Sequence, residues 1–147
     1  MNILFEDAAI IVIEKPSNLL SMASATERHK TAYAFLTDYM RLRNPQNAER
    51  VWIVHRLDRE TSGLMVFAKT ETAKRTLQAQ WPEVEKRYLA VVEGEPATNQ
   101  GVLTSHLDES GPFKVFSVAS SERTRHAVTH FQVVKQNEFY ALIELTP

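Results

Sequence analysis

The sequence predicts an α+β domain with a mixed, mainly antiparallel sheet and flanking helices. Two segments with helical periodicity lie in the first half of the chain, and five short strand-like runs follow in the second half. Five consecutive strands with no helix between them indicate an α+β domain. The 147 residues, 44% of them hydrophobic, have the length and composition of one globular domain.

The first half begins with two apolar runs, residues 3–5 and 9–13, separated as in a pair of strands. The sequence Lys-Pro-Ser-Asn at residues 15–18 then breaks the second run. Thr31 is a suitable N-cap for a helix over residues 32–43, which carries an apolar stripe at helical spacing.

A loop and a second helix follow. Residues 53–54 lead into the loop, and an apolar strand is expected at residues 64–68. Thr70 is expected to cap a helix over residues 71–80, which Pro82 closes. The later strands are expected to form an antiparallel meander because turn residues separate them; they span residues 87–92, 102–107, 114–118, 126–134 and 139–145.

Residues 55–64, His-Arg-Leu-Asp-Arg-Glu-Thr-Ser-Gly-Leu, are the most informative segment. They place one carboxylate, Asp58, between the guanidinium groups of Arg56 and Arg59. Two nearby cations favour the ionised form of an aspartate, which can then serve as nucleophile or base. The alternative is a turn shaped by Asp58 with solvated arginines. Ser62, His55 and Asp58 could also form a Ser/His/Asp nucleophilic site, although no Gly-x-Ser-x-Gly elbow accompanies them.

This segment resembles the signature of the RluA family of RNA pseudouridine synthases, His-Arg-Leu-Asp followed two residues later by Thr-Ser-Gly. Three further blocks are similar to family blocks and occur in the family's order: residues 11–17, 86–94 and 127–131. The resemblance implies a pseudouridine-synthase-like fold. It also implies that residues 1–147 form the N-terminal and central part of a catalytic domain.

The resemblance implies roles for single residues. Asp58 matches the catalytic aspartate, which acts at the sugar by attacking the anomeric carbon or removing a sugar proton. Arg56 matches the arginine that reaches towards RNA where the flipped nucleotide leaves the stack, and Tyr88 matches a tyrosine that stacks on the flipped uracil. The other RNA-binding candidates are His55, Arg59 and Lys69. For His55 the alternative is a hydrogen bond that stabilises the turn, and for Lys69 it is an exposed side chain without a binding role.

The expected chemistry requires no cofactor and no metal. The chain has no cysteine, which excludes a thiolate nucleophile and a cysteine-ligated zinc. His126 and His130 have an i, i+4 spacing that binds metal on a helix, but the segment is predicted to be a strand. A segment of 18 apolar residues and a signal peptide are both absent, so we expect a cytoplasmic protein without a membrane partner.

The expected partner is ribosomal or transfer RNA. The net charge of −1 gives no overall hint of nucleic-acid binding. Residues 50–87, however, carry eight Lys or Arg against five Asp or Glu. This modest basic excess surrounds the Asp58 motif, where a phosphate backbone would lie, although a solvated face explains it nearly as well.

The chain ends before the family's next block, Thr-Gly-Arg-x-His-Gln-(Ile/Leu)-Arg, so the fold is expected to be C-terminally incomplete. The missing part would supply sheet strands and a basic partner for Asp58. The strands at residues 128–134 and 139–145 are then expected to lose a neighbour, and the exposed sheet edge would favour self-association. Two alternatives stay open. One is a non-catalytic RNA-binding remnant; the other is a glycosidic hydrolase, which needs a second carboxylate, whereas the nearby Glu60 is expected to point elsewhere.

Overall fold

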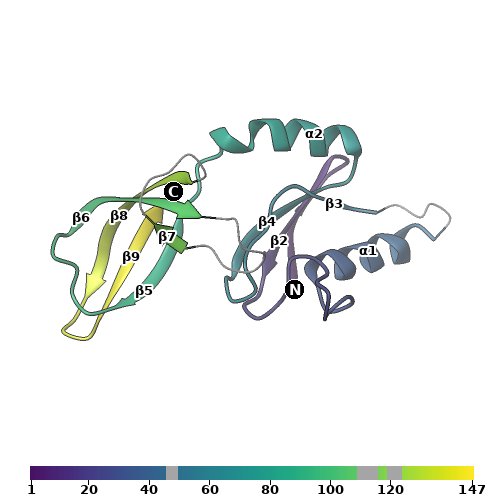
Figure 1. Cartoon of the computed structure of the whole chain (residues 1–147). Helices are drawn as coiled ribbons and strands as arrows, with labels where there is room; N and C mark the ends of the chain where they lie inside the picture. The colour runs from purple at the N-terminus through teal and green to yellow at the C-terminus, as the bar shows by residue number, and fades with distance from the viewer. Residues whose placement is uncertain (46–49, 109–115, 119–123) are drawn as a thin grey trace. The chain divides into compact units, whose positions relative to one another are not determined.

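The computed structural model describes residues 1–45, 50–108, 116–118 and 124–147 (Figure 1). The chain divides into two compact units, Met1–Val84 and Glu85–Pro147, called the first and second unit below. The first unit contains both α-helices and a four-stranded sheet, and the second contains a five-stranded sheet. The predicted α+β class with mainly antiparallel sheets is therefore confirmed. A single catalytic domain across the chain stays a prediction.

The sheet of the first unit has the strand order β1-β2-β4-β3, with antiparallel pairing throughout. The predicted strand pair at the N-terminus is confirmed, and β2 ends at the predicted break. The four strands are β1 (Asn2–Glu6), β2 (Ile10–Lys15), β3 (Trp52–Ile53) and β4 (Gly63–Ala68).

Both predicted helices and their N-caps are present. The hydroxyl of Thr31 accepts a hydrogen bond from the Ala34 N–H at the start of α1 (Ala32–Arg43). The hydroxyl of Thr70 likewise accepts from the Ala73 N–H at the start of α2 (Glu71–Gln80). A short 3-10 helix, η1 (Trp81–Glu83), follows α2 and contains the predicted helix-ending proline.

The core of the first unit lies between the sheet and α1. Side chains alternate between the two faces of a strand, so residues 11, 13 and 15 of β2 face the same way. Ile11 and Ile13 are fully buried there, together with Phe67 of β4 and Leu36 of α1. By the same alternation Lys15 also faces inward, and it too is fully buried.

The second unit is a sheet of strand order β5-β9-β8-β6-β7, again with antiparallel pairing. The predicted strands are found, but residues 114–115 and the turn at 110–112 lie outside the described residues. The five strands are β5 (Tyr88–Glu93), β6 (Gln100–Asp108), β7 (Phe116–Val118), β8 (Arg125–Gln136) and β9 (Tyr140–Thr146).

The predicted meander is wrong, because β5 pairs with β9 and not with the next strand, β6. The side chain of Asn137 accepts hydrogen bonds from the N–H groups of Phe139 and Tyr140, which folds β8 and β9 into a hairpin. The 12-residue β8 pairs along its other edge with β6. Turn residues set the hairpin locally, whereas the position of β5 depends on a contact between distant segments.

The expected loss of a neighbour by the strands at 128–134 and 139–145 is also wrong. These strands are β8 and β9, which lie inside the sheet and have two neighbours each. Within the described part of the chain, the edges of this sheet are β5 and β7.

Candidate functional site

Residues 55–61, called the Asp58 loop below, connect the two short strands β3 and β4. Within it Arg56 and Asp58 are exposed, whereas the side chain of Leu57 packs against the buried core. The loop therefore presents its charged groups to solvent on either side of an apolar anchor. Of Arg56, Leu57 and Asp58, Leu57 alone packs against the core. The positions of the Arg56 and Asp58 side chains therefore depend on the hydrogen bonds of the loop backbone.

The buried side chain of Lys15 is hydrogen-bonded to the backbone of the Asp58 loop. Its Nζ donates hydrogen bonds to the carbonyl oxygens of Arg59 at 3.2 Å, Leu19 at 2.7 Å and Pro16 at 3.0 Å. An ammonium group has three hydrogens, so these three acceptors can use all of them. Lys15 thus connects the end of β2 to the residue that follows Asp58.

The charge of Lys15 is also part of the site. Burial lowers the pKa of Lys15 below its ordinary value of 10.5, and the negative charges of Glu60 and Asp58 oppose that shift. A buried cation therefore lies near both carboxylates. Lys15 is not among the site residues predicted from the sequence, although its position two residues after Ile13 in a strand places it on the same inward face and was a signal for it.

The rest of residues 15–21, called the anchoring segment below, adds further contacts. The hydroxyl of Ser17 donates to the Glu60 carbonyl at 2.7 Å, and the Asn18 carbonyl accepts from Arg59 Nε at 3.4 Å. The Thr61 N–H donates to the Asp58 carbonyl at 3.2 Å and closes a turn. Gly63 then has a φ of +136°, a backbone conformation that glycine adopts without the steric cost of a side chain.

A pocket of about 440 Å³ opens beside the loop. It brings together Arg56, Asp58 and Arg59, three of the predicted site residues. Glu60 also lines it. Within the described part of the chain, neither arginine forms an ion pair with Asp58. The lining residues are Leu20, Ser21, Met22, Ala23, Ser24, Arg56, Leu57, Asp58, Arg59 and Glu60.

His55 has a structural role, but its hydrogen bond is to strand β4 and not to the turn that was considered for it. The Val66 N–H of β4 donates to His55 Nε2 at 3.1 Å, and the imidazole stacks on Trp81 with 4.1 Å between ring centroids. With Nε2 accepting this bond, that nitrogen cannot take a proton from Ser62, which is exposed and does not line the pocket. The geometry therefore gives no support to a Ser/His/Asp nucleophile.

Lys69 is not brought to the pocket of Asp58. It follows β4 at the end opposite Gly63, and six strand residues at ~3.3 Å each separate the two ends by roughly 20 Å. Its Nζ bonds Glu6 at 2.8 Å and the Asp7 carbonyl at 2.7 Å. The bond from Lys69 is the largest cause of the lowered pKa of Glu6. A phosphate contact by Lys69 stays a prediction.

Tyr88 belongs to the second unit. It is the first residue of β5, is half-buried and pairs with Leu145 of β9. Stacking of its ring on a flipped uracil stays a prediction.

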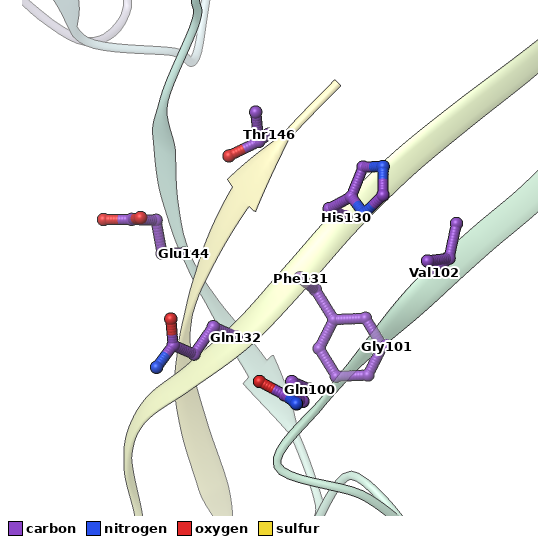
Figure 2. A pocket seen from close by; sticks show the side chains of 8 residues that line it. All are labelled: Gln100, Gly101, Val102, His130, Phe131, Gln132, Glu144 and Thr146. Carbon is purple, nitrogen blue, oxygen red and sulfur yellow. The ribbon is translucent and has the colours of Figure 1, made fainter.

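A second pocket, of about 410 Å³, lies on the sheet of the second unit (Figure 2). Strand pairing places its residues in two rows across β6, β8 and β9: Gln100, Gln132 and Glu144 in one, and Val102, His130 and Thr146 in the other. Among the described residues that line it, Glu144 is the only carboxylate and none is a lysine or arginine. This lining lacks the combination of carboxylate and guanidinium groups found in the first pocket, and this pocket is the weaker candidate.

The described residues contain no cluster of three His, Asp or Glu side chains suited to a metal ion. Among their helices, none is long and apolar enough to cross a membrane.

Comparison with known proteins gives a consistent result. A family model described as RNA pseudouridylate synthase matches residues 9–147. The ribosomal large subunit pseudouridine synthase D of Zymomonas mobilis is 32% identical over 149 residues, which cover 98% of this chain and 47% of that protein. The dual-specificity RNA pseudouridine synthase RluA of Vibrio cholerae is 33% identical over 150 residues, which cover all of this chain and 58% of that protein. The chain thus spans about half the length of the curated relatives it matches.

Solved structures show the same fold. The human RNA pseudouridylate synthase domain containing 4 superposes with a TM-score of 0.81 at 28% identity, covering 99% of this chain and 58% of that one. The human RNA pseudouridylate synthase domain containing 1 superposes with a TM-score of 0.72 at 18% identity, which supports the fold alone.

Proposed function

The chain belongs to the RNA pseudouridylate synthase family, and on this basis we propose that the protein isomerises a uridine of structured RNA, ribosomal or transfer, to pseudouridine with Asp58 as its catalytic carboxylate. One observation supports this role most directly. Asp58 is an exposed carboxylate that lines a pocket of about 440 Å³, on a loop whose backbone is hydrogen-bonded at the residue before it and at the residue after it. Reactive groups act best when the surrounding structure fixes their position.

In the proposed reaction the bond between N1 of uracil and C1′ of ribose breaks, the base rotates, and a bond forms between C5 and C1′. The proton on C5 is lost and N1 gains one, so the reaction is an isomerisation without oxidant or reductant. The Asp58 carboxylate acts at the sugar, as nucleophile at C1′ or as base towards a sugar proton. The pocket retains the free base while it turns.

Arg56 and Tyr88 act on the nucleotide itself in this proposal. A stacked uridine must leave its helix before its sugar can be reached, which costs a few kcal/mol. The exposed Arg56 offsets that cost through phosphate contacts and by filling the gap, and Arg59 adds positive charge to the same pocket. The Tyr88 ring stacks on the flipped base. A protein with such a substrate belongs in the cytoplasm.

The test replaces Asp58 in the complete gene product that carries these residues. Asp58→Asn is nearly isosteric, so it should abolish release of tritium from RNA labelled at C5 of uridine while folding stays intact. Asp38→Asn, at an exposed aspartate of α1, is the matched control and should keep full turnover. Substantial tritium release by Asp58→Asn would show that another group performs the reaction.

The same experiment separates catalysis from RNA binding alone. Arg56→Ala should weaken RNA affinity and flatten its salt dependence by about one phosphate contact, whereas Arg41→Ala on α1 should change neither. If the unaltered protein binds RNA with this salt dependence but releases no tritium, the non-catalytic RNA-binding alternative is correct.

We further propose self-association, through β5. This strand lies at a sheet edge among the described strands, and its Leu89 and Val91 are 66% and 70% exposed. Antiparallel pairing of β5 with a second copy about Ala90 places Leu89 opposite Val91 and Arg87 opposite Glu93. Apolar and opposite-charge cross-strand pairs are both stabilising. The mass in solution should therefore rise with concentration.

Sedimentation velocity tests this pairing. Val91→Lys should give a monomer at all concentrations, because a charge at an edge strand opposes pairing. Leu103→Lys, at another exposed apolar residue, on β6 away from that edge, should leave association unchanged. A concentration-independent mass for the unaltered protein would disprove the pairing.

A further inference from the structure

Ser21 is a buried serine at the end of the anchoring segment, with 3% of its surface exposed. Its hydroxyl oxygen lies 2.5 Å from the Leu57 carbonyl oxygen, to which it donates, and 3.1 Å from the Leu57 amide nitrogen, from which it accepts. One hydroxyl has a single hydrogen and two lone pairs, so both bonds can form at the same time. A single side chain thus satisfies both backbone polar groups of the residue between Arg56 and Asp58.

Ser21 is itself fixed to α1. Its carbonyl accepts from the Tyr33 N–H at 3.1 Å, and the carbonyl of Leu20 accepts from the Ala32 N–H at 2.8 Å. The first amides of a helix have no partner inside the helix, so these two bonds also complete the start of α1. Ala32 is fully buried in the core. Ser21 therefore joins a rigid helix start to the Asp58 loop.

The contacts of Leu57 also fix the two charged residues beside it, Arg56 and Asp58. The side chain of Leu57 packs on the core, and its backbone is bonded at both polar groups by Ser21. With residue 57 fixed at side chain and backbone, the chain directions of Arg56 and Asp58 are fixed too. A misplacement of about 1 Å at a reacting group can cost roughly 100-fold in rate.

We propose that Ser21 is a positioning residue for Asp58, which acts by holding the backbone of Leu57 through its hydroxyl group. Its effect on turnover rests on the proposed function, whereas its effect on the loop does not. The two are therefore measured separately, in the complete gene product, with the same three variants.

The variants are Ser21→Ala, which removes the hydroxyl, Ser21→Thr, which keeps it, and Thr37→Val as the matched control. Thr37 is a buried residue of α1, and its hydroxyl has no hydrogen-bond partner among the described residues. Thr37→Val thus removes a buried hydroxyl without touching the loop. Thermal unfolding of each variant shows that the assays are done on folded protein.

The first measurement is amide hydrogen exchange at Leu57. Ser21→Ala should speed it by about tenfold or more, since the loss of one such bond corresponds to about 1.4 kcal/mol, while the Phe67 amide in β4 keeps its protection. Ser21→Thr should restore slow exchange, and Thr37→Val should leave it slow. Unchanged exchange at Leu57 in Ser21→Ala would overturn the proposal, whatever the protein catalyses.

The second measurement is turnover. Ser21→Ala should lower kcat by about tenfold or more with KM for RNA nearly unchanged, because substrate still binds while the carboxylate is misplaced. Ser21→Thr should recover most of kcat. A normal kcat in Ser21→Ala, in an active protein, would refute the positioning role. If the unaltered protein releases no tritium, the proposed function fails, and exchange at Leu57 alone decides whether Ser21 holds the loop.

Discussion

The two pockets described above are nearly equal in size, about 440 Å³ and 410 Å³, but their walls are held in different ways. The pocket of the second unit lies on three strands of one sheet, in which β8 pairs with both β6 and β9. The pocket of Asp58 is lined by the Asp58 loop and by residues 20–24, which no sheet ladder holds. Buried side chains hold that loop instead, chiefly Lys15 and Ser21.

This difference shows where to look for function in a small domain. Functional residues are found on loops fixed by a rigid scaffold more often than on the scaffold itself. A loop that needs rigidity but lacks a ladder requires polar side chains beneath it, and burying them is costly unless every bond is made. A fully buried lysine whose hydrogens all reach backbone carbonyls is therefore a stronger indication of a site than the size of a pocket.

The largest effect is expected from removing the cation beneath the Asp58 loop. Lys15→Met keeps the length of the side chain but removes three hydrogen bonds from a charged donor to part-buried backbone carbonyl groups, so it should lower the free energy of unfolding by about 3 kcal/mol or more. Trp52 and Trp81 both belong to the first unit, so tryptophan fluorescence during urea unfolding reports on it. The exposed Lys30→Met is the control. Equal stabilities of the two variants would show that the loop is held by other contacts.

The charge of Lys15 adds a pH dependence of known sign. Burial lowers the pKa of Lys15 in the folded protein below its ordinary value of 10.5, so the unfolded chain binds the proton more strongly. Stability rises with pH wherever the unfolded state binds more protons. The quantity to compare is the difference in free energy of unfolding between the unaltered protein and Lys15→Met. This difference should increase as pH rises through the interval just below 10.5. A difference that is flat with pH would mean that Lys15 is not the titrating group.

Much of the first unit could be predicted from the sequence because its signals are local. The capping threonines, the apolar run of β2 and the break that follows it all act within a few residues. The anchoring of the loop could not be predicted, since Lys15 and Arg59 are distant in sequence and meet only in the folded chain. The same reason explains the wrong meander, because the β5–β9 pairing joins segments about 50 residues apart.

A smaller effect is expected at Asn18, whose backbone has a φ of +66° in the anchoring segment. Asparagine tolerates this left-handed conformation better than most residues do, whereas alanine is disfavoured there by about 1 kcal/mol. Asn18→Ala should therefore destabilise the first unit by about that amount, while Asn18→Gly should be nearly neutral. The Asn18 carbonyl still accepts from Arg59 in both variants, so a difference between them isolates the backbone conformation. Thermal unfolding followed by fluorescence measures it, and equal melting temperatures would count against strain in this turn.

An effect on stability of similar size, with none on turnover, is expected in the second unit, at Gly101 of β6. A Cβ atom added there would lie 2.8 Å and 3.1 Å from two ring atoms of Phe131, shown beside Gly101 in Figure 2. The far end of a ring can move aside, so Gly101→Ala should cost only about 1 kcal/mol of stability. Adding Phe131→Leu should recover part of it by removing the crowded ring atoms. Because the second pocket has no role in the proposed reaction, kcat should stay unchanged in both variants when turnover is measured well below their melting temperatures. A fall in kcat with stability nearly intact would mean that this pocket takes part in the reaction, and the contrast between the two pockets would then be wrong.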